Sequence, residues 1–159
     1  MKIFLDIDGV MVHANPMKKL DFEDDGFYKF NIEAVNAINV LNNENNEVIL
    51  STSHRFRYTK KEWKNIFKRR GIYFKKISLI EIGLENYFSR KIEIESWIIE
   101  KNILPEDFLI IDDDKSLNGL RDEYKSRLVL TNSYTGLKSP KELEKFAISN
   151  RNSIRKRVK

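Results

Sequence analysis

The sequence predicts an α/β protein with a three-layer, Rossmann-like fold built on a parallel central sheet. Apolar segments that suit buried strands alternate with segments of helical periodicity along the chain, and this alternation is typical of a parallel sheet covered by helices on both faces. Three of the apolar segments end directly in acidic or hydroxyl residues. Because ligands bind beyond the carboxyl ends of the strands in such sheets, the three polar ends are expected to meet at one site.

The first half of the chain opens with the apolar run Ile3-Phe4-Leu5, which predicts a strand at 2–6. A polar stretch at 13–30 predicts a loop that can form a flap but is too short to fold as a separate cap domain. The elements expected next are a helix at about 31–42, a strand at 47–51 and a helix at about 60–69. So small a cap would leave the site open to a large substrate.

The second half of the chain continues the same alternation. The expected elements are a short strand near 77–80, a helix at about 90–101, a strand at 108–111, a short helix near 116–123, a strand at 127–131 and a helix at about 140–148. Pro140 follows Ser139 at the start of the last helix, where proline is favoured.

Length and composition favour a single domain at 1–150, followed by a basic tail at 151–159. Of the 159 residues, 41% are hydrophobic, which is ample for one core. No apolar run approaches the ~20 residues that a membrane-spanning helix needs, and the lack of cysteine excludes disulfides and thiolate metal sites. The first residues read as a core strand and not as a signal peptide, so a cytoplasmic location and no membrane partner are expected.

Asp6 and Asp8 lie one residue apart at the end of the first predicted strand. Residues at i and i+2 of a strand project to the same side, and two carboxylates placed there repel each other unless a cation lies between them. Hard oxygen ligands of this kind suit Mg²⁺. Gly9 follows where the chain must turn, and a residue without Cβ lets backbone N–H groups approach a phosphate. The segment therefore predicts phosphate chemistry at a magnesium site, with Gly9 binding the substrate.

Two further strands end in polar residues. The strand at 47–51 runs into Ser51-Thr52-Ser53, and the strand at 108–111 runs into Asp112-Asp113-Asp114. If these strands lie beside the first one, Asp112 and Asp113 join the metal-site acids, and the hydroxyls lie at the same edge of the sheet.

These motifs resemble those of the haloacid dehalogenase (HAD) superfamily. Its first motif, an apolar strand followed by DxDG and Thr or Val, is similar to Asp6-Ile7-Asp8-Gly9-Val10. Its second motif is a strand that ends in Ser or Thr, as at Ser51, and its fourth is a strand that ends in an acidic pair, as at Asp112-Asp113. The third motif is a basic residue near the start of the preceding helix, and the spacing does not separate Arg90 from Lys91.

The resemblance extends to one subgroup, the HAD domain found in Swiss Army Knife RNA repair proteins. The segments that carry it are Asp24-Asp25-Gly26-Phe27, Ser51-Thr52-Ser53-His54-Arg55 and Ile110-Ile111-Asp112-Asp113-Asp114. The similarity covers the chain from residue 1 to about 146 and does not include the basic tail.

The resemblance implies a Mg²⁺-dependent phosphatase. Asp6 would attack the phosphorus and form an aspartyl-phosphate, while Asp8 would protonate the leaving oxygen and later take a proton from water. The metal ligands would be the side chains of Asp6 and Asp113 and the backbone carbonyl of Asp8. Asp112 belongs to the same group of metal-site acids, with an orienting role favoured over direct binding.

Other residues near these motifs are assigned to the phosphate. Ser51 would hydrogen-bond a phosphate oxygen, and Arg90 or Lys91 would balance its charge. Thr52 and Arg55 are predicted to bind substrate, although Arg55, which follows His54, suits a surface ion pair equally well. Asp114 is expected to cap the helix that begins near residue 116.

The charge pattern bears on the substrate. The net charge is +5, and the segment from His54 to Lys76 holds ten Lys or Arg against the single acid Glu62, with six aromatic residues interleaved. A basic surface with exposed rings is typical of single-stranded nucleic-acid binding, while a solvated helix face explains the charges equally well. Trp63 and Trp97 have helical spacing to apolar neighbours and are predicted to be core residues.

Together these features predict a Mg²⁺-dependent phosphatase that acts on phosphorylated RNA or DNA ends, as in RNA repair, or on nucleotides. One alternative is a phosphatase of small molecules. The other is a nucleic-acid-binding module of the same fold without turnover, against which the intact Asp6 and Asp8 argue.

Overall fold

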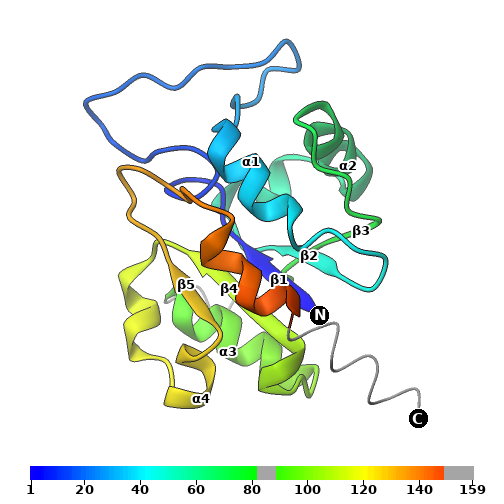
Figure 1. Ribbon diagram of the computed structural model, residues 1–159, viewed down its shortest axis with the longest axis vertical. Helices are drawn as coiled ribbons and strands as arrows, with labels where there is room; N and C mark the ends of the chain where they lie inside the picture. Colours follow the sequence, from blue (N-terminus) through cyan, green and yellow to red (C-terminus); the bar gives the residue numbers. More distant parts are fainter. Residues whose placement is uncertain (82–88, 149–159) are drawn as a thin grey trace.

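Five parallel strands form the centre of the molecule, in the order β3-β2-β1-β4-β5 (Figure 1). In this computed structural model, residues 1–81 and 89–148 are described. The strands are β1 (Lys2–Leu5), β2 (Glu47–Leu50), β3 (Lys76–Leu79), β4 (Phe108–Asp112) and β5 (Leu128–Leu130). The predicted α/β, Rossmann-like fold with a parallel sheet is confirmed, and the first strand lies at its centre.

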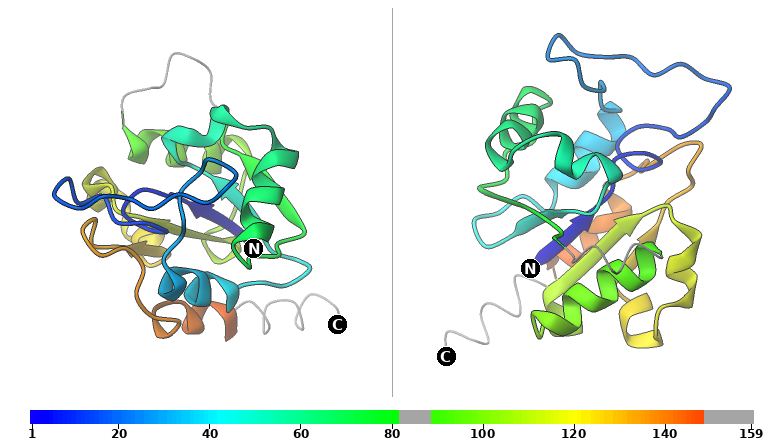
Figure 2. Two further views of the ribbon diagram at one scale, coloured as in Figure 1. Left: turned by 90° about the horizontal axis from the view of Figure 1, so that it is seen from above. Right: turned by 180° about the vertical axis from the view of Figure 1, so that it is seen from behind.

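Helices cover both faces of the sheet, as the views from above and behind show (Figure 2). Helices α1 (Ile32–Asn39), α2 (Lys60–Arg69) and a last helix at 141–148 pack on one face. Helix α3 (Arg90–Glu100), the 3₁₀ turn η4 (Lys115–Gly119) and helix α4 (Asp122–Lys125) pack on the other. Two further 3₁₀ turns are η1 (Ser53–Arg57) and η3 (Pro105–Asp107). Among the described residues, no helix has the length and apolar character needed to cross a membrane.

The two cores follow from the alternation of side chains along the strands. In β1, Ile3 and Leu5 pack against the face covered by α1 and α2, whereas Phe4 packs against the face covered by α3. Trp63, one of the largest side chains of α2, is fully buried and donates a hydrogen bond to the carbonyl of Arg55. Trp97 is half-buried, with its ring edge-on to Phe4. Both tryptophans contribute to the cores as predicted.

Most predicted elements are present with boundaries shifted by one to three residues. The helix expected at 31–42 ends at Asn39, because an Asx turn in which Asn43 accepts a hydrogen bond from the backbone of Asn45 leads the chain into β2. The single helix expected near 116–123 is wrong. Leu120 is extended, with ψ of 151°, and divides this segment into η4 and α4. As predicted, Asp114 caps η4 by accepting a hydrogen bond from the backbone of Ser116.

The segment at 13–30 is an irregular loop, as expected, and one arginine of α2's C-terminus fastens it to the body. Arg70 is 8% exposed and donates to both carboxylate oxygens of Asp25, at 2.7 and 2.8 Å. The same guanidinium donates to the carbonyls of Phe27 and Tyr28. Phe27, a residue of this loop, is buried. The predicted basic tail at 151–159 lies outside the described residues.

Candidate active site

The register of the sheet places three polar residues side by side at the carboxyl ends of the central strands. Leu5 of β1 is paired with Leu50 of β2 and with Ile111 of β4, so the residues that follow are Asp6, Ser51 and Asp112. Backbone hydrogen bonds continue the ladder through this row, from Asp6 N to the carbonyl of Ile111 and from Ser51 N to the carbonyl of Leu5, both at 3.1 Å. The predicted convergence of the strand ends is therefore present.

Three carboxylates gather at this edge. Asp6, Asp112 and Asp113 each offer one oxygen, and these oxygens lie within 4.8 Å of one another. Asp6 is 6% exposed and Asp112 is fully buried. We call these three residues the acid cluster. Since oxygen ligands of this kind suit Mg²⁺, the acid cluster can bind a metal.

Gly9 leaves the space that Asp113 occupies. Its φ of +73° lies in the left-handed region, and a Cβ on this residue would lie 2.1 Å from Oδ2 of Asp113. The carbonyl of Gly9 accepts a hydrogen bond from Thr131 Oγ1 at 2.7 Å. Any other residue in place of Gly9 would therefore clash with Asp113. This packing requirement adds to the access for phosphate that the sequence suggested.

Arg90 is the cation that reaches the acid cluster. It lies in the first turn of α3, which Ser89 caps by accepting a hydrogen bond from the backbone of Ile92. Its Nε lies 3.1 Å from Asp112 Oδ2, and its Nη2 lies 3.7 Å from Asp6 Oδ2. Lys91 instead pairs with Glu95 at 3.3 Å. Of the two candidates for the third motif, Arg90 alone contacts the acids among the described residues.

Burial and mutual repulsion raise the pKa values of the acid cluster. Burial, followed by the charge of Asp6, raises the pKa of Asp112 to about 8 and that of Asp113 to about 6. Burial also raises the pKa of Asp6, although the nearby Arg90 opposes it. Three carboxylates beside one guanidinium carry excess negative charge, which a divalent cation would offset.

Asp8 stands apart from the acid cluster and faces a histidine. His54 Nε2 lies 2.8 Å from Asp8 Oδ2, with the two side chains 21% and 36% exposed. The side chain of Asp8 is not part of the acid cluster, and a metal contact through its backbone carbonyl stays a prediction. Sequence reasoning noted His54 after the second motif but assigned it no function, because the contact depends on how η1 folds back toward β1.

The hydroxyls of the second motif lie beside Asp6. Ser51 is fully buried, and within the described ranges its Oγ has no hydrogen-bond partner. Thr52 hydrogen-bonds the carboxylate of Asp6, which lowers the pKa of Asp6, and its Oγ1 accepts a hydrogen bond from the backbone of His54. Thr52 therefore contacts Asp6 directly, and Ser51 follows β2 beside it in the row of strand ends.

Arg55 points into the protein. It is 4% exposed, donates to the carbonyls of Ser51, Thr52 and Ile80, and forms an ion pair with Glu93 of α3. Glu93 also accepts a hydrogen bond from Arg90 Nη1 at 3.0 Å. Arg55 thus joins η1 to β3 and α3, and supports Arg90 through a shared carboxylate.

A family comparison agrees with this geometry. The model of the HAD domain in Swiss Army Knife RNA repair proteins matches residues 2–141. The chain belongs to this family. The resemblance seen in the sequence is therefore confirmed, and the domain has the phosphatase-type, hydrolase-like fold of HAD proteins, which usually use Mg²⁺.

Other comparisons add little to the HAD assignment. No curated protein matches the chain. Among solved structures, the crystal structure of a hypothetical protein from Xanthomonas campestris has a TM-score of 0.47 and 13% sequence identity, with coverage of 99% of this chain and 85% of the other.

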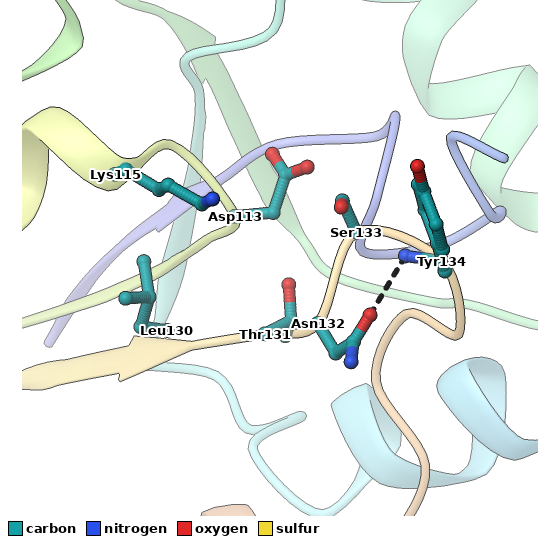
Figure 3. A pocket seen from close by; sticks show the side chains of 7 residues that line it. All are labelled: Asp113, Lys115, Leu130, Thr131, Asn132, Ser133 and Tyr134. Atoms are coloured by element: carbon teal, nitrogen blue, oxygen red, sulfur yellow. Dashed lines mark hydrogen bonds between the residues drawn. The ribbon is translucent and has the colours of Figure 1, made fainter.

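A pocket opens beside the acid cluster of this HAD domain (Figure 3). Its volume is about 590 Å³, and its lining comes from Asp113 and from the segments around η4 and β5. The lining residues are Asp113, Lys115, Leu130, Thr131, Asn132, Ser133 and Tyr134. Tyr134 is 57% exposed, and Figure 3 shows Asp113 between Lys115 on one side and Ser133 and Tyr134 on the other. The pocket therefore lies directly beside Asp113 and has an exposed aromatic ring in its lining.

The basic segment of the HAD domain is only partly a surface feature. Three of its six aromatic residues, Trp63, Phe67 and Phe74, are buried, whereas Phe56 and Tyr73 are exposed. Its buried arginines, at positions 55 and 70, serve internal contacts. Of the predicted basic surface with interleaved aromatic rings, the exposed cations therefore remain, but few of the rings are exposed.

Proposed function

We propose that this HAD domain is a Mg²⁺-dependent phosphatase that removes a terminal phosphate from nucleic-acid ends through an aspartyl-phosphate on Asp6. The observation that carries the proposal is the convergence of Asp6, Asp113 and Arg90 at the end of β1, with an open pocket beside them. A nucleophile, a metal site and a fixed positive charge within one crevice are what phosphoryl transfer needs.

The residues present fit Mg²⁺. The donors are carboxylate oxygens, and the acid cluster has more negative charge than Arg90 balances. Asp6 and Asp113 would hold the ion with the backbone carbonyl of Asp8, while Asp112 is committed to Arg90. When bound, the metal would neutralise charge on the phosphate and on its attacking carboxylate.

Asp6 is oriented for attack. Its Oδ1 accepts a hydrogen bond from the backbone of Ile7 at 2.8 Å, which leaves Oδ2 on the side of Arg90. In the first step, a carboxylate oxygen of Asp6 bonds to phosphorus, the ester P–O bond breaks, and Asp8 gives its proton to the leaving oxygen. In the second step, water attacks phosphorus, Asp8 takes the proton from water, and the Asp6 carboxylate is released with inorganic phosphate.

The remaining site residues bind the phosphate or support those that do. Arg90 would offset the charge on the phosphate oxygens, and the hydroxyls of Ser51 and Thr52 would hydrogen-bond to them. Gly9 leaves the backbone open to the same anion. Arg55, because its guanidinium is engaged by carbonyls and by Glu93, is assigned to positioning instead of the predicted substrate contact.

Three features support nucleic-acid ends as the substrate. The family takes its name from RNA repair proteins. The pocket of about 590 Å³ beside Asp113 is open and offers an exposed tyrosine on which a base can stack. The segment between β1 and α1 is an irregular loop without a folded cap domain, which suits a large substrate.

The test is phosphate release in the presence and absence of Mg²⁺. The substrates compared are 3′- and 5′-phosphorylated RNA and DNA oligonucleotides, free nucleotides and an aryl phosphate. We expect Mg²⁺-dependent release from one class of oligonucleotide end and a loss of about 10³-fold or more in Asp6→Asn, which lacks the nucleophile. Release from small phosphates alone would favour a small-molecule phosphatase, and oligonucleotide binding without any release would favour a silent binding module.

A further inference from the structure

We propose that His54 is a positioning residue for the acid–base carboxylate of Asp8, and that the loop at 13–30 holds His54 in place. This inference rests on the function proposed above, because Asp8 matters to His54 only if it transfers protons. It adds a residue outside the acid cluster to the reaction.

The contact between the two side chains fixes one oxygen of Asp8. With the carboxylate ionised, His54 Nε2–H donates to Oδ2 over 2.8 Å. Oδ1 then remains for the exchange of a proton with the leaving oxygen or with water. Because the Asp8 side chain is 36% exposed and lies outside the acid cluster, the His54 contact restricts rotations that would otherwise move the carboxylate away from the substrate.

His54 is itself held by the chain on both sides. Its backbone N–H donates to Thr52 Oγ1 within the turn that follows β2. Its ring stands edge-on to two rings of the loop, at 5.7 Å and 81° from Phe27 and at 5.5 Å and 84° from Tyr28. T-shaped contacts of this kind are favourable and help to hold the ring in this orientation.

The loop carries these two rings because α2 fastens it. Arg70 binds both oxygens of Asp25 and the carbonyls of Phe27 and Tyr28. A continuous set of contacts therefore runs from Arg70 through the two aromatic residues to His54 and ends at Asp8. These contacts would give residues 24–28 and His54 a role in the reaction, although none of them belongs to the acid cluster.

The leaving group distinguishes positioning of a general acid from a packing role. An aryl ester expels a stable phenolate and needs little protonation, whereas an alkyl ester expels an alkoxide that must be protonated. We would therefore measure kcat and KM for 4-nitrophenyl phosphate and for glycerol 2-phosphate, two small esters that make no demand on nucleic-acid recognition. The variants are His54→Leu, which removes the donor, and His54→Gln, whose amide nitrogen can replace Nε2.

We expect His54→Leu to lower kcat for glycerol 2-phosphate on the order of 10²-fold and for 4-nitrophenyl phosphate by less than about threefold, with similar KM values for both. His54→Gln should restore most of the lost rate. In an Asp8→Asn background, His54→Leu should cause no further loss, because the two residues act as one unit. The control is His13→Gln, which alters the other histidine of the chain and should match the wild type.

Equal losses on both esters would overturn the proposal and assign His54 to packing. If thermal unfolding shows that His54→Leu does not fold, His54→Phe replaces it, because it keeps a ring against Phe27 and Tyr28 and removes the donor. It must then show the same selective loss on glycerol 2-phosphate, and equal losses on both esters would contradict positioning. A wild-type protein that releases phosphate from neither ester and from no oligonucleotide end would refute the proposed function and this inference with it. A wild type that hydrolyses both, with a His54→Leu variant that equals it on both, would refute the inference alone.

Discussion

Arg90 and Lys91 are adjacent in sequence yet serve different surroundings. Arg90, Ile94 and Ile98 are spaced by four residues and share one face of α3, and both isoleucines are buried. Lys91 and Glu95 occupy the next face and pair there at 3.3 Å. The motif alone did not show which of the two cations faces the acid cluster. The position of Arg90, four residues before an isoleucine that is buried, indicates that Arg90 lies on the inner face of the helix.

Replacing Arg90 should cost both stability and activity. In Arg90→Met, the buried carboxyl of Asp112 loses its ion pair at 3.1 Å, and we expect the free energy of unfolding to fall by about 3 kcal/mol. Phosphate release should fall on the order of 10²-fold. Lys91→Met removes only a partly exposed surface pair, so its effect on stability should stay below about 1 kcal/mol. Urea unfolding at pH 9, where the Asp112 carboxyl is ionised, and a phosphate assay measure both effects, and equal effects of the two substitutions would contradict this account of α3.

At the scale of elements, the strands were the most predictable part of the fold. All five follow from short apolar runs that end in polar residues, and their order along the chain already implied a common edge. Helix boundaries were less predictable because they depend on local turns, such as the Asx turn at Asn43 and the extended Leu120 that divides η4 from α4. The contact of His54 with Asp8 could not be predicted, since it joins residues 46 positions apart through the folding of the 3₁₀ turn η1.

The attachment of the loop at 13–30 to α2 should depend on Asp25. Arg70 lowers the pKa of Asp25 to about 2, so the ion pair stabilises the fold above the unfolded value near 4, and this contribution is lost as the pH falls through about 2. In Asp25→Asn we expect faster amide hydrogen exchange at 22–30 and a loss of about 1 kcal/mol in stability. Asp24→Asn changes an exposed neighbour and is the matched control. Unchanged exchange in Asp25→Asn would mean that the carbonyl contacts of Arg70 suffice.

At the scale of the whole molecule, the exposed cations of α2 offer a surface for a nucleic-acid backbone. Lys64 and Lys68 are exposed, lie one turn apart, and follow the turn that carries His54. If they contact phosphates, replacing both with Gln should raise KM for an oligonucleotide but not for 4-nitrophenyl phosphate. The slope of log affinity against log salt should become shallower by about 1.4 for a single strand. Lys101→Gln with Lys125→Gln removes the same charge beyond the opposite face of the sheet, and an equal effect there would indicate nonspecific attraction.

The acid cluster should make the stability of the metal-free protein fall as pH rises. Burial raises the pKa values of Asp113 and Asp112 to about 6 and about 8, so the folded protein binds protons more tightly than the unfolded chain. That stabilisation is present below pH 4 and is lost as the pH rises through these two values. The pKa values of Asp25 and Glu47 are lowered, so these carboxyls titrate away from this window.

We therefore expect the Tm in a chelator to fall between pH 5 and pH 8, and Mg²⁺ to reverse this fall. Because the metal binds deprotonated carboxylates, its stabilisation should increase with pH, reaching about 2.7 kcal/mol at pH 8 when Mg²⁺ is present at 100 times its Kd. Asp113→Asn should abolish the Mg²⁺ effect and flatten the pH dependence near pH 6, whereas Asp122→Asn, at an exposed position on α4, should change neither. A Tm that is unaffected by Mg²⁺ at pH 8 in the wild type would contradict metal binding by the acid cluster. A response that survives in Asp113→Asn would instead place the metal on other ligands.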